Sequence, residues 1–139
     1  MIRQTFGTAK VPLSPAVRAG DFVFVSGQVP VGPDGKVVPG GIGPETRAVI
    51  DNIRAALALA GCGLEDVVKT TVWLRDRDDF AAFNAAYAEA FPTDPPARST
   101  AESRLMIDIA VEIEAIAFKP LKAARGGRRR ASGSPPSAP

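Results

Sequence analysis

Two amphipathic helical segments with a strand-like segment between them constrain the fold of this 139-residue chain more than any other feature. Residues 43–61 place apolar side chains on one face at helical spacing, and residues 80–91 carry a stripe of aromatic rings. That stripe consists of Phe80, Phe83, Tyr87 and Phe91. The intervening residues 67–74 (VVKTTVWL) are rich in β-branched side chains, which favour a strand. The chain length fits a single domain in which both helices pack on strands.

Further strand signals flank the two helices. Residues 17–28 read as two short strands that meet at a tight turn around Gly20. Another strand opens at Arg98 after a proline-rich break, and residues 109–118 alternate in the manner of a strand. The predicted order is therefore β-β-α-β-α-β-β, a mixed sheet with two helices on one face.

The opposite face of this sheet is predicted to be apolar as well. The segment FVFV, residues 22–25, is apolar on both sides of its strand, and Ile116 and Phe118 share the face opposite Ile113. An exposed apolar sheet face is a liability for a monomer. We therefore expect another copy of the chain to cover this face.

The chain has no histidine and a single cysteine, Cys62. A Ser-His-Asp or Cys-His nucleophile system and an HExxH zinc site are thus excluded, and a metal site would need carboxylates almost alone. Cys62 follows a helix with no basic neighbour in sequence, so it is expected to be inert. One cysteine, no signal-like segment and no membrane-length apolar run indicate a cytoplasmic protein.

Basic charge is concentrated at the C-terminus. Residues 1–118 hold 11 basic and 15 acidic side chains, whereas residues 119–139 hold six basic and no acidic ones. We expect a folded domain over residues 1–120 and a disordered Gly/Ser/Pro/Arg-rich tail over residues 121–139. Its RGGRRR segment offers a contact for RNA or another polyanion, although composition favours a solvated extension without a partner. Nucleic-acid binding by the mildly acidic domain itself is not expected.

Arg98 is the foremost candidate for binding a small organic anion. Prolines fix the approach of the chain, and a guanidinium binds a carboxylate through two parallel N–H bonds. The alternative is a surface arginine, or one paired with Asp94 or Glu102. Spacing alone favours that alternative.

Glu112 and Glu114 are candidates for general acid/base chemistry. They lie on the same face of an apolar strand, a setting that raises the pKa of a carboxyl group towards neutrality. Pairing with basic side chains, or exposure to water, is an equally good interpretation. Ser26 and Gly27 end a strand at a loop, and Asn84 lies at the polar edge of the second helix. For these three residues a structural role is the simpler interpretation.

The order of these segments resembles the RidA (YjgF-type) family of reactive-intermediate deaminases over about residues 12–118. Three segments carry the resemblance: FVFVSGQVP (22–30), the segment from TRAVIDN to AYAEAF (46–91), and PARST followed by VEIEAIAF (96–100 and 111–118). The last pair corresponds to the family's signature region and is quite specific.

The resemblance implies an α+β protein of chorismate-mutase-like architecture that forms a homotrimer with sites between subunits. It implies hydrolysis of 2-imino or 2-enamino carboxylates, such as 2-aminoacrylate and 2-iminopropanoate, to a 2-keto acid and ammonia, with no cofactor and no metal. Arg98 matches the carboxylate-binding arginine and Glu112 the glutamate that holds the attacking water. Ser26, Gly27, Asn84 and Thr100 match positions that line the substrate pocket.

Three positions depart from the family pattern. Ser14-Pro15-Ala16 replaces a Gly-Pro-Tyr segment that supplies a pocket tyrosine, Thr100 replaces a common cysteine, and residues 105–107 replace a Leu-Pro pair. An enlarged cleft at Ala16 is compatible with a bulkier catabolic enamine. A non-enzymatic, carboxylate-binding regulatory trimer is the alternative from another class, and an endoribonuclease or translation inhibitor is disfavoured by the acidic domain without histidine.

Overall fold

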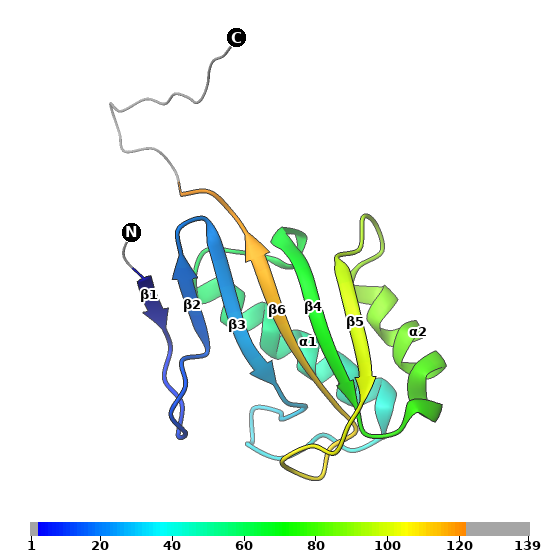
Figure 1. Ribbon diagram of the computed structural model, residues 1–139. Helices are drawn as coiled ribbons and strands as arrows, with labels where there is room; N and C mark the ends of the chain where they lie inside the picture. The colour runs from blue at the N-terminus through cyan, green and yellow to red at the C-terminus, as the bar shows by residue number, and fades with distance from the viewer. Residues whose placement is uncertain (1–2, 122–139) are drawn as a thin grey trace, which may run out of the picture.

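The computed structural model describes residues 3–121, which form a six-stranded sheet with two helices on one face (Figure 1). The strands are β1 (Arg3–Phe6), β2 (Ala16–Ala19), β3 (Phe22–Gln28), β4 (Val67–Leu74), β5 (Ala97–Glu102) and β6 (Val111–Phe118). The helices are α1 (Ile42–Leu59) and α2 (Phe80–Ala90), and two short 3-10 turns, Leu64–Asp66 and Arg77–Asp79, precede β4 and α2. The expected α+β class with both helices on one face is confirmed.

The sheet order is β1-β2-β3-β6-β4-β5, so the last strand of the chain lies in the middle of the sheet. All neighbouring pairs are antiparallel except β4 and β5, which run parallel and are connected through α2 (Figure 1). The predicted order was wrong at the N-terminus, because β1 precedes the strands expected there. This strand is short, largely exposed and without apolar alternation, so periodicity gave no signal for it.

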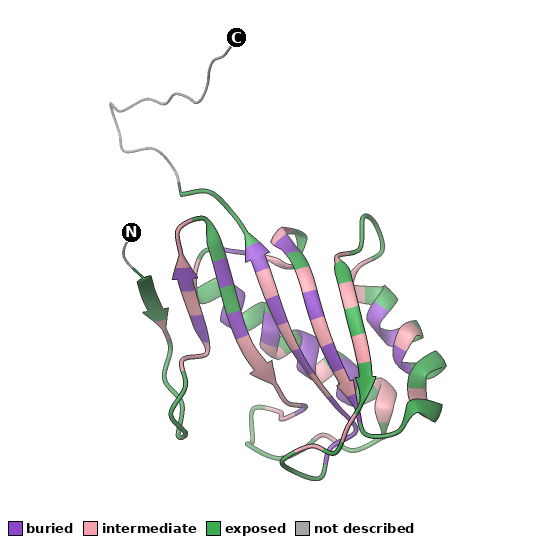
Figure 2. Cartoon of the chain, in the orientation of Figure 1, coloured by how far each residue is buried: buried purple, intermediate pink, exposed green. Residues whose placement is uncertain are grey.

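Burial alternates along β6, the strand whose pattern was clearest. Every second side chain from Val111 to Ala117 is buried against the helices, and Glu112, Glu114 and Ile116 between them are only partly buried (Figure 2). The strand begins at Val111 rather than at Ile109 as predicted. The faces of its side chains are as expected.

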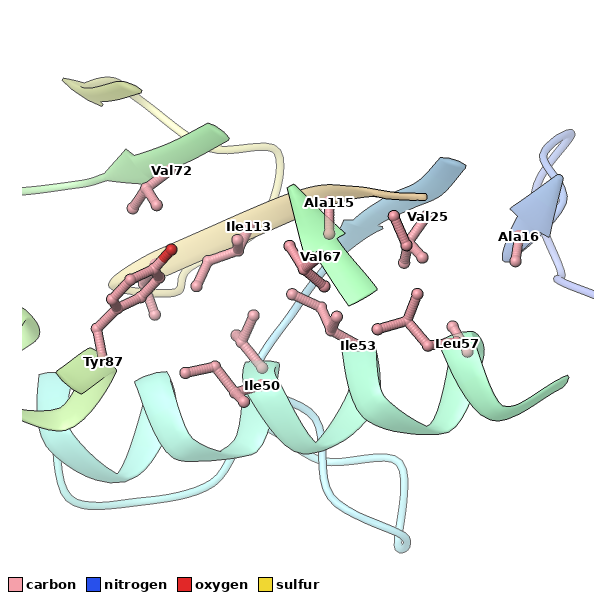
Figure 3. Packing of buried hydrophobic residues seen from close by; sticks show 14 of the residues in the cluster. Ala16, Val25, Ile50, Ile53, Leu57, Val67, Val72, Tyr87, Ile113 and Ala115 are labelled. Atoms are coloured by element: carbon pink, nitrogen blue, oxygen red, sulfur yellow. The ribbon is translucent and has the colours of Figure 1, made fainter. Parts of the chain in front are cut away.

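The core lies between α1 and the sheet. Ile50, Ile53 and Leu57 recur at helical spacing on α1 and point at the sheet, where Val25 and Ile113 are among the side chains that face them (Figure 3). All five are at least 96 % buried, so α1 is held by close packing along its length.

The start of α1 is tied to the start of β6. The helix begins at Ile42, with Gly41 as its N-cap at a positive φ of 82°, slightly earlier than the start predicted at residue 43. In its first turn, the buried Glu45 carboxylate accepts a hydrogen bond from the backbone N–H of Ala110 at 2.7 Å. This contact places the beginning of β6 against the helix.

The face of the sheet opposite the helices carries exposed aromatic rings. Phe22, Phe24 and Phe118 are each between 41 and 44 % exposed, and the rings of Phe22 and Phe118 lie 5.1 Å apart. No helix within residues 3–121 covers this face (Figure 1). The expectation of an uncovered apolar face is therefore confirmed for the single chain.

The C-terminal tail and the absence of a membrane-spanning segment were also predicted from the sequence. The expected disordered tail, residues 121–139, lies outside the described residues except for Leu121, so it stays a prediction together with the domain boundary at 120. None of the helices described between residues 3 and 121 is long and apolar enough to cross a membrane.

Candidate functional site

Arg98 lies on the helix-covered side of the sheet and rests on aromatic rings. On β5 it pairs in parallel register with Thr70 of β4, whose side chain is buried beneath α2. The guanidinium carbon lies 4.9 Å from the ring centre of Tyr87, 5.3 Å from that of Phe83 and 5.6 Å from that of Phe80. These distances are those of cation–π contacts. The aromatic stripe of α2 thus supports the candidate anion-binding group.

Arg98 forms no ion pair with any described residue. The pairing with Asp94 or Glu102 that was weighed as an alternative is absent. The Glu102 carboxylate instead accepts a hydrogen bond from the backbone N–H of Arg77 at 2.9 Å. A half-buried guanidinium whose hydrogen-bond donors have no internal carboxylate is available to an external one.

Two of the predicted site residues have buried polar atoms without a partner. Within residues 3–121, three buried side-chain polar atoms lack a hydrogen bond, and two of them are Asn84 Oδ1 and Thr100 Oγ1. Thr100 is two residues beyond Arg98 on the same side of β5. Asn84 lies between Phe80 and Tyr87 along the stripe of α2. Both atoms are therefore available for a hydrogen bond on the side of the sheet that carries Arg98.

A surface hollow of about 420 Å³ adjoins Thr100 at the end of β5. Its lining residues are Leu74, Arg77, Asp78, Phe80, Thr100, Ala101 and Glu102. The wall combines apolar and charged groups, as in sites that bind small organic molecules.

Glu112 lies on the other side of the sheet. It pairs with Trp73 of β4, one of the side chains that alternate away from the helices. Its carboxyl group sits directly over Gly27 of β3, where a Cβ atom would be 3.2 Å from Glu112 Cδ and still closer to Oε2. The sheet register is irregular between Val25 and Gln28, next to this contact. A side chain at position 27 would therefore displace the Glu112 carboxyl group from this position.

The environment of Glu112 favours its neutral form. Burial raises the pKa of the Glu112 carboxyl group above its ordinary value, and the nearby negative charge of Glu114 raises this pKa further. A carboxylate with a raised pKa is a better proton acceptor, because it binds a proton more tightly near neutral pH. Glu112 is thus suited to act as a general base.

Ser26 holds the strand next to Glu112 in place. Its hydroxyl group donates a hydrogen bond to the backbone carbonyl of Ser14 at 2.6 Å, and its backbone N–H donates to that of Pro15 at 3.0 Å. The hydroxyl is thus engaged within the chain. Ala16, at the position expected to enlarge the cleft, is fully buried in the core cluster of the single chain.

The two principal candidates therefore lie on opposite faces of one sheet. Arg98 shares its face with buried Thr70, whereas Glu112 shares its face with Trp73, three residues further along β4. Side chains an odd number of residues apart on a regular strand point in opposite directions. The structure brings Arg98, Asn84 and Thr100 together, and it brings Glu112, Gly27 and Ser26 together. It does not join the two groups within one chain.

Two site features escaped the sequence analysis. Thr70, which hydrogen-bonds Tyr87 beneath Arg98, gave no signal in a β-branched strand. Arg104 lines a hollow of about 180 Å³ beside Glu112 and Trp73 on the open face. Arg104 lies in the loop before β6, where no sequence pattern distinguished it from other surface charges. The described residues hold no group of three or more Cys, Asp or Glu side chains arranged for a metal ion.

A family model described as Endoribonuclease L-PSP matches residues 5–119. The chain belongs to this family. The RidA resemblance is thereby confirmed, since proteins named RidA and RutC occur among the similar proteins of this L-PSP family. A RutC family protein of Pyrococcus horikoshii is 50 % identical over 110 residues, which cover 78 % of this chain and 87 % of the relative.

Among the other similar proteins are a named deaminase and two solved structures, one of them with a bound ligand. The 2-iminobutanoate/2-iminopropanoate deaminase of Escherichia coli K12 is 42 % identical over 113 residues, covering 78 % of this chain and 88 % of the relative. The crystal structure of yeast Mmf1 superposes with a TM-score of 0.81 at 36 % identity, covering 85 % of this chain and 99 % of that one. E. coli TdcF with bound serine gives 0.78 at 34 % identity, covering 84 % and 98 %.

Proposed function

We propose that this protein hydrolyses reactive 2-imino or 2-enamino carboxylates, of the 2-aminoacrylate/2-iminopropanoate type, to a 2-keto acid and ammonia. The observation that carries the proposal is the half-buried Arg98 guanidinium, which rests on three aromatic rings and has no acidic partner in the described residues. The deaminase name of a 42 % identical relative supports the same reaction. Such chemistry in the cytoplasm needs neither a metal nor a cofactor, because imines also hydrolyse unaided.

The site is completed between subunits of a homotrimer. Arg98 with Asn84 and Thr100 forms one half, and Glu112 with Gly27 and Ser26 forms the other. Because these halves lie on opposite faces of the sheet, one chain presents Arg98 to one neighbour and Glu112 to the other. The exposed Phe22, Phe24 and Phe118 on the Glu112 face support such an interface. A cyclic arrangement repeats this contact and leaves no half-site unused.

Each half of the site has a separate task in the reaction. The guanidinium of Arg98 holds the substrate carboxylate through paired N–H bonds and thereby fixes the imine carbon. Glu112 of the adjoining subunit accepts a proton from water as the water oxygen bonds to that carbon. The imine nitrogen takes up this proton, which gives a carbinolamine. Glu112 then transfers the proton of the new hydroxyl group to the nitrogen, the C–N bond breaks, and ammonia leaves as the keto group forms.

A dehydratase-coupled assay tests the reaction. A threonine or serine dehydratase releases the imino acid, semicarbazide traps it, and the purified protein is expected to lower the rate of trapping. Arg98→Ala and Glu112→Gln are expected to abolish this effect. If the wild-type protein does not accelerate loss of the imine, or if Arg98→Ala is as active as wild type, the proposal is wrong.

Subunit mixing tests the division of the site. Arg98→Ala and Glu112→Gln proteins are unfolded together at equal concentrations and refolded, with each protein refolded alone as the control. A site that takes Arg98 from one subunit and Glu112 from the next is intact in about a quarter of random pairings. Recovery of about that fraction of wild-type activity is expected. No recovery would show that both residues of a site belong to the same subunit.

A further inference from the structure

A buried polar pair lies directly beneath Arg98. The hydroxyl oxygens of Thr70 and Tyr87 are 2.7 Å apart, within hydrogen-bond distance, and either hydroxyl can be the donor. Thr70 is 1 % exposed and Tyr87 5 %, so water does not compete for this bond. The ring of Tyr87 belongs to the buried hydrophobic cluster between the helices and the sheet.

Arg98, Thr70 and Tyr87 are each in contact with the other two. The backbone of Arg98 is held beside Thr70 by the β4–β5 register, and its guanidinium lies 4.9 Å from the ring centre of Tyr87. Of the three rings beneath the guanidinium, that of Tyr87 is the nearest. The hydrogen bond between Thr70 and Tyr87 joins the two supports of Arg98 to each other.

The contribution of this pair to stability is expected to be small. A buried hydrogen-bonded pair that is replaced on both sides by apolar groups of the same shape leaves stability nearly unchanged. Valine and phenylalanine would fill the same space without any unpaired hydroxyl. Packing therefore explains the ring of Tyr87, which also contacts Phe83 and Phe91, but not the two hydroxyl groups.

We propose that Thr70 and Tyr87 are positioning residues for Arg98, setting the tilt of the Tyr87 ring and thereby the direction of the guanidinium fork. A fork binds a carboxylate bidentately only when its plane meets that of the carboxylate. The pair thus determines how tightly the carboxylate of the substrate is held. This inference rests on the proposed function, since it assigns the pair a role in the same site.

Single and double variants of Thr70 and Tyr87 separate an effect on the position of Arg98 from an effect on stability. Thr70→Val and Tyr87→Phe each leave one buried hydroxyl without a partner, whereas the double variant leaves none. Stability is therefore expected to fall in each single variant and to recover in the double variant. Carboxylate affinity, measured by calorimetry with 2-ketobutyrate, is expected to fall about three- to tenfold in all three. In the coupled assay KM should rise with little change in kcat.

Thr46→Val is the matched control. Thr46 is fully buried on α1, and its Oγ1 atom forms no hydrogen bond with any residue between 3 and 121. The same chemical change is therefore expected to leave affinity at the wild-type value and stability equal or slightly higher. Arg98→Lys provides the second comparison. Combined with Tyr87→Phe, it should bind no more weakly than Arg98→Lys alone, because a lysine has no fork to orient.

A readout without ligand distinguishes failure of this inference from failure of the proposed function. The side-chain Nε–H signal of Arg98 should be shifted by the ring current of Tyr87, and this shift should shrink in the double Thr70→Val/Tyr87→Phe variant. Loss of the shift supports the pair's role even if the protein neither binds 2-ketobutyrate nor hydrolyses imines. An unchanged shift, or an affinity that recovers together with stability in the double variant, overturns the inference.

Discussion

At the scale of single residues, Glu112 is the side chain whose chemistry depends most on its neighbours. Burial, and then the charge of Glu114, raises the pKa of its carboxyl group. Folding thus favours the protonated form of Glu112. The protonated Glu112 carboxyl group therefore contributes to stability. This contribution is fully present below the pKa that the group has in the unfolded chain, and it is lost as the pH rises through its higher pKa in the folded chain. Ionisation of Glu112 therefore opposes folding, an environment that is common for functional groups.

Replacing Glu114 should change the pH dependence of the reaction. Glu114→Gln removes the like charge, so the pKa of Glu112 falls and its basic form persists to lower pH. The acidic limb of the kcat/KM profile is expected to move to lower pH, with little change in the maximal rate. Pre-steady-state or coupled assays across the acidic range measure this limb. A limb that stays in place would show that Glu112 is not the titrating base.

A side chain at position 27 is expected to impair the reaction rather than the fold. In Gly27→Ala the new methyl group would overlap the Glu112 carboxylate and displace it. A displacement of about 1 Å at a catalytic group lowers the rate roughly 100-fold. We expect a loss of that order in kcat/KM while affinity for 2-ketobutyrate, held by Arg98, is largely retained. Gly43→Ala, in the first turn of α1, is the control for general effects of the substitution, because the added methyl group there would make only an ordinary van der Waals contact with Arg47.

At the scale of elements, the junction of α1 and β6 links the core to the site. The Glu45 carboxylate, in the first turn of α1, accepts the backbone N–H of Ala110 just before β6 begins. The position also suits the positive end of the helix. Two residues further along β6 the chain reaches Glu112, so the register of that strand depends on this contact.

Removing the Glu45 acceptor should destabilise the domain. Glu45→Ala leaves a buried backbone donor unpaired, which costs about 1–3 kcal/mol in the free energy of unfolding. Glu45→Gln keeps an acceptor oxygen and is expected to lose less. Urea unfolding followed by fluorescence of the single tryptophan, Trp73, measures both. Equal losses in the two variants would mean that charge, rather than the hydrogen bond to Ala110, accounts for the effect.

At the scale of the whole molecule, the uncovered face of the sheet determines the proposed assembly. Phe24 is 44 % exposed in the single chain and lies on the same face as Glu112. Phe24→Asp places a charge in the proposed interface and is expected to convert the oligomer to monomers at micromolar concentration, with loss of activity. Sedimentation velocity measures the mass. Wild-type protein that is already monomeric at this concentration would contradict the proposed assembly.

Leu59→Asp is the matched control for this change. Leu59 is 54 % exposed at the end of α1, on the helical layer and away from the aromatic face. The same charge at this position should leave the mass of the oligomer unchanged. If both variants dissociate, the loss of the oligomer in Phe24→Asp would be due to general destabilisation rather than to a charge in the interface.

Sequence patterns predicted most of the elements because burial follows simple periods. The 3.6-residue period located both helices, and the two-residue period assigned the faces of β6 correctly. β1 was missed because its four residues are mostly exposed and carry no period. The support of Arg98 by Phe80, Phe83 and Tyr87 was also missed. The sequence showed the stripe as an apolar helix face, but it did not show that the Arg98 guanidinium rests on this face.

The sequence by itself determined which residue types were available, which chemistry they excluded, and which side chains of α1 and β6 are buried. Only the tertiary structure decided that Arg98 and Glu112 face opposite sides of the sheet. The physical reason is that the direction of a strand side chain depends on its register with neighbouring strands. Hydrogen bonds between segments far apart in the chain set that register, and no local pattern records it.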